Sequence, residues 1–192
     1  MNKAIKIILS LVSMLVFFMN CKKSTDAVTI SPIDDNLILN SSFETESGPS
    51  LKGWIYSNTA EYGFFPDAPD GGGRYSLILR PVWRGYFSFN AVMTKIALPT
   101  GTHWYRLSCW GRKQINGAGS IHLFVGKGNV DTMTATLTIP VVDSLWTFYS
   151  TEIEITNNSN DSAVVALHGG YSPIQYLADS TFFDLCKFER LD

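Results

Sequence analysis

The sequence predicts one all-β domain, a two-sheet β-sandwich of jelly-roll type with about ten strands. Short runs rich in Val, Ile, Thr, Tyr, Phe and Trp recur along the chain, separated by Gly, Pro, Asn and Asp. From residue 36 onward, no window keeps an apolar period of 3.6 residues long enough for a helix of three turns. The predicted strands are Asn36–Asn40, Gly53–Ser57, Arg74–Arg80, Tyr86–Ile96, His103–Arg112, Ser120–Val125, Thr134–Val141, Trp146–Thr156, Ala163–His168 and Thr181–Leu191.

Alternation within these runs predicts which side chains face the interior, because successive residues of a strand point to opposite faces. In the run His103–Arg112, Tyr105, Leu107 and Cys109 share one side and suit the core. The opposite side carries Trp104, Arg106, Ser108, Trp110 and Arg112. We therefore expect Trp110 and Arg112 to point away from the core.

The N-terminus has the layout of an export signal. Lys3 and Lys6 precede an apolar run, Ile7–Met19, which is shorter than the roughly 20 residues that a membrane-spanning helix needs. The segment Phe18-Met19-Asn20-Cys21 resembles the recognition box of bacterial lipoproteins, although Phe18 and Asn20 replace the usual Leu and small residue. That resemblance implies lipidation of Cys21 and removal of residues 1–20. A plain secretory signal ending near a cysteine is the alternative.

A polar segment, residues 21–35, follows the signal and is expected to be a flexible tether to a domain over residues 36–192. The resemblance to lipoproteins implies an outer-membrane location, facing the periplasm or the cell surface, because Lys22 is not the Asp of an inner-membrane retention signal. Without residues 1–20 the chain has 13 basic against 17 acidic residues. This balance gives no basic patch for nucleic acid.

Two cysteines, Cys109 and Cys186, remain besides Cys21, in a protein expected in an oxidising compartment. Both lie within apolar strand patterns. They could form a disulfide, or each could be a free buried thiol that packs as a small hydrophobe.

Several segments resemble carbohydrate-binding modules of families 4, 9 and 22, which are galactose-binding-like jelly rolls. The opening segment Asn36–Glu44 followed by Gly53-Trp54 carries the first part of the resemblance. The later parts, in the order of the family, are Gly73–Leu79, Gly101–Trp110, Trp146 to Ile153 and Phe183–Cys186. The resemblance covers the whole domain and implies non-catalytic binding of a polysaccharide or oligosaccharide.

The resemblance also implies a structural calcium ion. Glu44 and Asp184 stand where the family has acidic ligands, and backbone carbonyls near Asn40 and Gly73 could complete an oxygen shell. Leu185 replaces a second acid that commonly closes the family's site. In the alternative interpretation, Glu44 and Asp184 are turn and edge residues that hydrogen-bond to the backbone.

Glycan recognition needs flat rings for the C–H faces of sugars and polar groups for their hydroxyls. The predicted ligand-binding residues are Trp83, Tyr86, Trp110, Arg112, His168 and Tyr171. The alternative for the aromatic ones is a role as core plugs at strand ends. Trp54 and Trp146 match packing positions of the family and are assigned to the core.

Motifs of catalysis are absent from the sequence, which has no His-Glu-x-x-His, Cys-x-x-Cys, Gly-x-Ser-x-Gly or phosphate-binding glycine loop. Glu152 and Glu154 share a strand face, a spacing close to that of glycosidase carboxylates, but such a pair usually marks a solvated face. We therefore expect a binding protein without enzyme activity. An adhesion or interaction subunit that docks an envelope protein is the second hypothesis, and a glycoside hydrolase the third.

Overall fold

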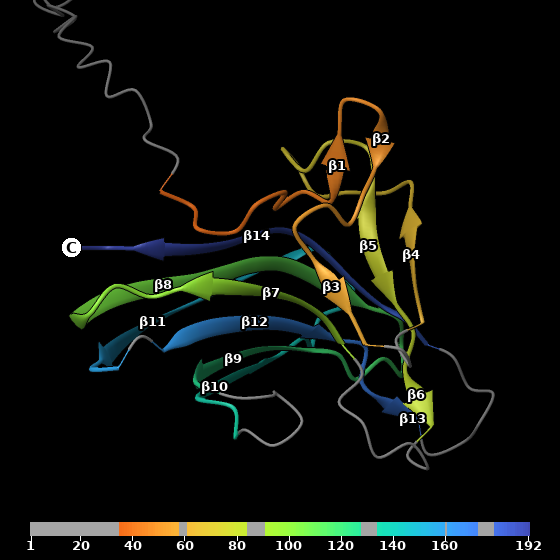
Figure 1. Cartoon of the computed structure of the whole chain (residues 1–192). Coiled ribbons are helices and arrows are strands. Elements are labelled where there is room, and N and C mark those ends of the chain that lie inside the picture. The colour runs from red at the N-terminus through yellow and green to blue at the C-terminus, as the bar shows by residue number, and fades with distance from the viewer. Residues whose placement is uncertain (1–34, 58–60, 84–90, 128–133, 160, 173–178) are drawn as a thin grey trace, which may run out of the picture. The chain divides into compact units, whose positions relative to one another are not determined.

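The computed structural model describes residues 35–57, 61–83, 91–127, 134–159, 161–172 and 179–192 (Figure 1). The predictions for residues 1–34, which include the signal and Cys21, and for Tyr86 lie outside these ranges. The compact unit comprises Asp35–Asp192. Its described residues form strands and turns without a helix. None of the described segments is therefore a helix able to cross a bilayer.

Two five-stranded sheets dominate this unit, which is the predicted two-sheet sandwich. The first sheet has the order β11-β8-β14-β5-β4 and consists of Thr147–Asn157, Gly101–Lys113, Thr181–Arg190, Ser76–Leu79 and Tyr62–Phe65. The second has the order β10-β9-β12-β7-β3 and consists of Leu137–Pro140, Ser120–Gly126, Ser162–His168, Ala91–Ala97 and Ile55–Tyr56. All pairs within both sheets are antiparallel.

Two small ribbons complete the described strands. β1 (Glu44–Thr45) pairs with β2 (Gly48–Pro49) as an antiparallel hairpin. β6 (Val82–Trp83) pairs in parallel with β13 (Tyr171–Ser172), which brings the main chains of two predicted site segments side by side.

The core lies between the two large sheets and follows the predicted alternation. Tyr105, Leu107 and Cys109 of β8 are at most 1% exposed. Tyr105 stacks on Phe188 of β14, with ring centroids 4.9 Å apart and planes within 5°. Trp54 is buried as predicted. The prediction for Trp146 is wrong, because its side chain is only partly buried and lies outside the core cluster.

The described strands number fourteen, more than the ten predicted. The four-residue strand β4 and the dipeptide strands β1, β2, β6 and β13 escaped prediction because they are too short for visible alternation. The predicted strand over residues 36–40 is wrong: Asn36 makes a single bridge to Glu189, and the chain then turns. The Asn36 side chain accepts the backbone N–H of Ile38 at 3.1 Å, a local bond that competes with a strand ladder.

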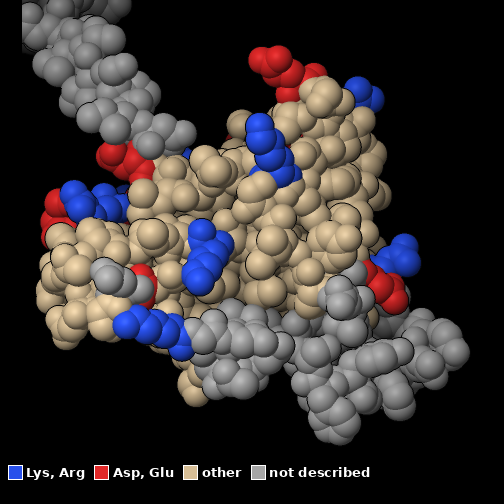
Figure 2. Space-filling model, viewed as in Figure 1, with Lys and Arg blue, Asp and Glu red and all other residues tan. Residues whose placement is uncertain are grey.

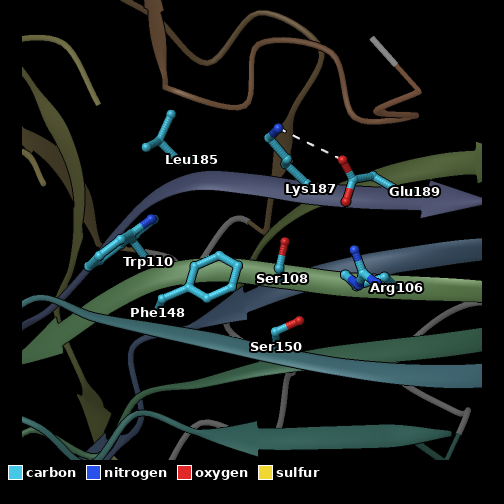
Figure 3. Close-up of a pocket in the computed structure, with 8 residues that line it drawn as sticks. All are labelled: Arg106, Ser108, Trp110, Phe148, Ser150, Leu185, Lys187 and Glu189. Atoms are coloured by element: carbon cyan, nitrogen blue, oxygen red, sulfur yellow. Dashed lines mark ion pairs between the residues drawn. The ribbon is translucent and has the colours of Figure 1, made fainter. Parts of the chain in front are cut away.

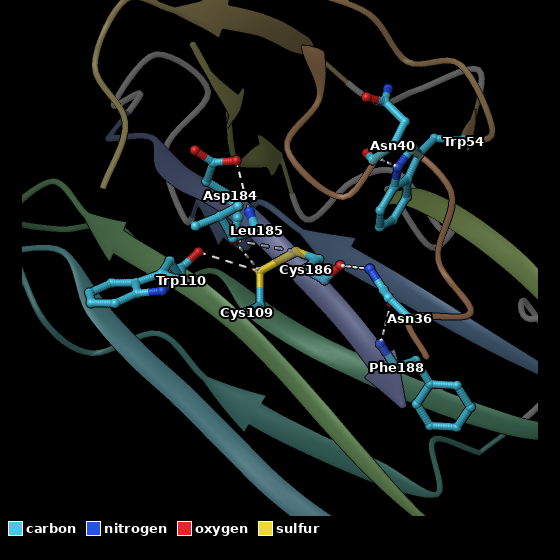
Figure 4. The surroundings of a disulfide bond; sticks show 9 residues. All are labelled: Asn36, Asn40, Trp54, Cys109, Trp110, Asp184, Leu185, Cys186 and Phe188. Carbon is cyan, nitrogen blue, oxygen red and sulfur yellow. Dashed lines mark hydrogen bonds between the residues drawn. A yellow bond between two sulfur atoms is a disulfide. The ribbon is translucent and has the colours of Figure 1, made fainter. Parts of the chain in front are cut away.

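A disulfide joins Cys109 in β8 to Cys186 in β14, across 77 positions of sequence (Figure 4). The sequence left open whether these cysteines form a disulfide or are free buried thiols, and the structure shows the disulfide. It lies beside a register shift of β14 between Asp184 and Lys187. The segment before β1 is also hydrogen-bonded at this place, because Cys186 donates its N–H to the Ser41 carbonyl at 3.0 Å.

Candidate functional site

A groove of about 470 Å³ lies on the outer face of the first sheet, over strands β11, β8 and β14 (Figure 3). Its walls combine aromatic, hydroxyl and charged side chains. The lining residues are Arg106, Ser108, Trp110, Phe148, Ser150, Leu185, Lys187 and Glu189. Trp110 therefore points away from the core, as the alternation predicted.

The register between β8 and β11 builds the aromatic end of this groove. Trp110 lies opposite Phe148, and Ser108 lies opposite Ser150. The centroids of the two rings are 5.6 Å apart and their planes are tilted by 53°. Phe148 is 51% exposed, so this ring presents much of its surface to solvent.

Charged side chains form the other end of the groove. The Arg106 guanidinium donates to Glu152 Oε1 through Nε at 3.2 Å and through Nη2 at 2.7 Å. This hydrogen bond raises the pKa of Arg106, which stays charged. Lys187 and Glu189 form a looser pair at 3.8 Å. Donors and acceptors for hydroxyl groups thus lie next to the two rings.

Arg112 shares the outer face of β8 with Trp110 but is engaged by the protein itself. Its guanidinium pairs with Asp67 at 2.7 Å and lies 4.0 Å from the centroid of the Phe182 ring. The Trp146 ring is 5.3 Å away on another side. Trp146 also donates from Nε1 to Asp67 at 3.3 Å. These contacts indicate a structural role for Arg112 beside the groove.

His168 belongs to the other sheet and is only 4% exposed. His168 was predicted to bind ligand, and that role stays a prediction for a side chain that is buried. Its Nδ1 accepts the N–H of Gly170 at 3.2 Å, and its ring lies 5.9 Å from that of His122. Burial lowers the pKa of both imidazoles to about 4, and the neighbouring His122 adds to the effect on His168.

Trp83 and Tyr171 lie in the parallel ribbon of β6 and β13, where Ser172 is the register partner of Trp83. The structure thus brings these two predicted residues together at the level of the main chain. It places them in a ribbon separate from the sheet that carries Trp110. The roles of Trp83, Tyr86 and Tyr171 in ligand binding stay predictions.

Sequence reasoning missed Phe148 and Ser150 as groove residues. A signal was present: both alternate with the inward residues of 146–156 and share the face of Glu152 and Glu154. The register that sets Phe148 opposite Trp110 was not visible, since it depends on how two strands pair.

The predicted metal ligands Glu44 and Asp184 both lie against the turn at residues 71–73. A Cβ atom added at Gly72 would overlap Asp184 Oδ2, and one added at Gly73 would overlap Glu44 Oε2. Glycine at these two positions therefore allows the carboxylates their close approach. Glu44 accepts the backbone N–H groups of Arg74 and Tyr75 at 3.0–3.1 Å.

Asp184 is fully buried, and within the described part of the chain its Oδ2 has no hydrogen-bond partner. Burial, together with the charge of Glu44, raises the pKa of Asp184 to about 8. A cation between the two carboxylates would offset the free-energy cost of burying the charged Asp184 next to Glu44. Calcium fits such a site because it prefers oxygen ligands. The described residues contain no cluster of three or more His, Cys, Asp or Glu, so backbone carbonyls would have to complete the shell.

The fold is that of the β-sandwich carbohydrate-binding modules. Among solved structures, a family 4 module matches over 80% of this chain and 99% of its own length, with a TM-score of 0.55 and 13% identity. A family 16 module gives the same coverages and TM-score at 18% identity. A putative sugar binding protein from Bacteroides thetaiotaomicron matches over 81% of this chain and 100% of its own, with a TM-score of 0.53 and 10% identity.

Parts of enzymes share the fold as well. The enzymatically active domain of tailspike protein 4 from bacteriophage CBA120 matches over 81% of this chain, with a TM-score of 0.55 and 17% identity. The match covers only 21% of that tailspike chain. No protein-family model and no curated protein matches the sequence.

Proposed function

We propose that this protein is a non-catalytic glycan-binding protein and that the groove over β8 and β11 holds the sugar. The observation that carries the proposal is the pair of the half-buried Trp110 and the exposed Phe148, with polar side chains beside it. Apolar ring faces cover the C–H faces of sugars, while Arg106 and Ser150 offer partners for hydroxyl groups. The fold shared with carbohydrate-binding modules supports the proposal.

One feature of the groove favours sugar over a protein partner, and another does not. Its rings stand among serines and ion pairs, whereas a protein-docking surface is expected to be a broad apolar patch. The tilt of 53° departs from the parallel rings that would be ideal for a flat sugar chain. Docking of an envelope protein therefore remains the second hypothesis, and the same experiment separates the two.

The test is an affinity titration of the folded domain against plant and microbial glycans, with Trp110→Ala as the diagnostic variant. Removing the ring should weaken binding at least tenfold, because buried aromatic contacts commonly contribute 2 kcal/mol or more. Ile115→Ala is the control, since Ile115 is 87% exposed and lines no part of this groove. A folded protein that binds none of the glycans would overturn the proposal.

A hydrolase remains the least supported alternative. Glu152, one of the two acids on β11, is held in an ion pair by Arg106, and its side chain is 49% exposed. A glycosidase acid needs a sheltered carboxyl beside the scissile bond. We propose that Glu152 positions Arg106 instead.

We also propose that the protein is an outer-membrane lipoprotein, exposed to the periplasm or the surface and anchored by acyl chains on Cys21. The sequence Phe18–Cys21 supports this proposal. Two or three chains hold a protein stably, since each buried CH₂ contributes about 0.8 kcal/mol. Labelling with radioactive palmitate should mark the wild type and spare Cys21→Ala; equal labelling would contradict the anchor.

Finally, we propose that a calcium ion binds between Glu44 and Asp184 and stabilises the turn at 71–73. Calcium should raise the melting temperature of the wild type, because an ion that binds only the folded state stabilises it. Asp184→Asn should abolish that rise while keeping the shape of the side chain. An equal rise in the variant would contradict the site, and Glu154→Gln is the control for a general effect of surface charge.

A further inference from the structure

A second groove, of about 480 Å³, lies on the same sheet as the proposed glycan site, over strands β4 and β5. On the outer face its side chains come from Glu61, Phe65, Ile78 and Arg80. Tyr62 and Phe64 alternate with these residues along β4 and point toward the second sheet, where Tyr62 contacts Tyr56. Phe65 is 40% exposed, so its ring is available to a ligand.

The polar groups of this groove are held side by side by the backbone. Arg80 donates its N–H to the Glu61 carbonyl at 2.9 Å, which fixes the ends of β4 and β5 together. The Arg80 guanidinium and the Glu61 carboxylate then lie at the same end of the groove, and their charges sum to zero. A pair of this kind supplies both donors and acceptors to hydroxyl groups and gives no advantage to a charged ligand.

The second groove lies on the same outer face of the sheet as the first. Phe182 of β14 pairs in register with Arg112 of β8 and with Ile78 of β5. The Phe65 ring meets the Phe182 ring at 5.4 Å, and the Arg112 guanidinium covers Phe182 at 4.0 Å. Arg112 is two residues from Trp110 along β8.

Strand spacing sets the separation of the two grooves. Three inter-strand steps separate Arg112 from Gly63, and one two-residue step along β8 separates it from Trp110. With about 4.8 Å between strands and about 3.3 Å per residue, the grooves lie on the order of 15 Å apart. A ridge made by Arg112 and its partner Asp67 lies between them.

We propose that the groove over β4 and β5 is a second contact site for the same glycan chain, with Phe65 as its stacking ring. This inference rests on the proposed function. A polymer long enough to cross the ridge engages both grooves, whereas a short oligosaccharide occupies only the one at Trp110. Because the second contact is then intramolecular, it adds affinity for polymer through effective concentration.

The experiment compares a polysaccharide with its own trisaccharide, using the glycan that the wild type binds best. Phe65→Ala should weaken binding of the polymer about tenfold, within the range that a second tethered site contributes, and leave the trisaccharide affinity within twofold. Trp110→Ala should weaken both ligands. Ile115→Ala, which removes an exposed apolar side chain outside both grooves, is the control.

Folding of each variant is checked by its thermal transition, and Phe65→Leu serves as a second variant that keeps apolar contact with Phe182 but loses the ring. Unchanged polymer affinity in folded Phe65→Ala and Phe65→Leu would overturn the second site and leave the proposed function intact. Equal loss for trisaccharide and polymer would overturn it as well, since both grooves would then act as one short site. Failure of every glycan to bind would instead overturn the proposed function.

Discussion

Arg112 shows at the scale of one residue what alternation can and cannot predict. Alternation correctly placed this residue on the outer face of β8, which suggested a ligand contact. The structure adds Asp67, Phe182 and Trp146 as partners, and they come from distant parts of the sequence. Pairings of this kind follow from how strands and loops pack, so a single strand pattern cannot predict them.

Arg112→Ala is expected to destabilise the domain by about 2 kcal/mol, through loss of the cation–π contact and of packing over Phe182. Arg112→Lys should recover less than half of this, because an ammonium lacks the flat guanidinium that covers a ring. Urea unfolding of both variants measures the effect. If the variants bind glycan more weakly but are as stable as the wild type, Arg112 contacts the ligand and its role is not structural.

At the scale of elements, the long strands were predicted well and their pairing was not. The runs at 103–112 and 146–156 match β8 and β11 to within two residues, and their alternation fixed the outward side of Trp110. The groove, however, exists because β8 pairs with β11 so that Trp110 meets Phe148. A shift of the register by one residue would turn Phe148 inward, and nothing in either strand alone specifies that choice.

The disulfide between β8 and β14 should contribute strongly to the stability of this sheet. It closes a loop of 77 residues, for which chain-entropy arguments give about 4 kcal/mol at room temperature. The double variant Cys109→Ala, Cys186→Ala should therefore unfold at much lower denaturant concentration than the oxidised wild type. Reduced wild type is the control that keeps both sulfur atoms; identical midpoints for oxidised and reduced protein would contradict a stabilising bond.

At the scale of the whole molecule, charge is spread thinly. Figure 2 shows Lys, Arg, Asp and Glu scattered singly over the visible coloured surface, without a basic patch. The dependence of stability on pH should therefore reflect groups with unusual surroundings more than overall repulsion. Two such groups lie on the second sheet, the buried His168 and the half-buried His122.

Burial lowers the pKa of His122 and His168 from 6.5 to about 4, so between these values the unfolded chain binds protons that the folded protein does not. Stability is then greatest above about pH 6.5 and falls as the pH drops toward 4, by an amount of order a few kcal/mol. In His122→Gln, which can still hydrogen-bond to Ser120 and Thr138, the loss of stability over this range should be smaller. The free energy of unfolding, measured in urea from pH 7 to pH 4, tests this, with His103→Gln on the first sheet as the control. If the free energy of unfolding falls equally with pH in the wild type and in His122→Gln, His122 does not stay neutral in the folded protein. Water would then reach the His122 side chain on the outer face of the second sheet more freely than the burial of this side chain indicates.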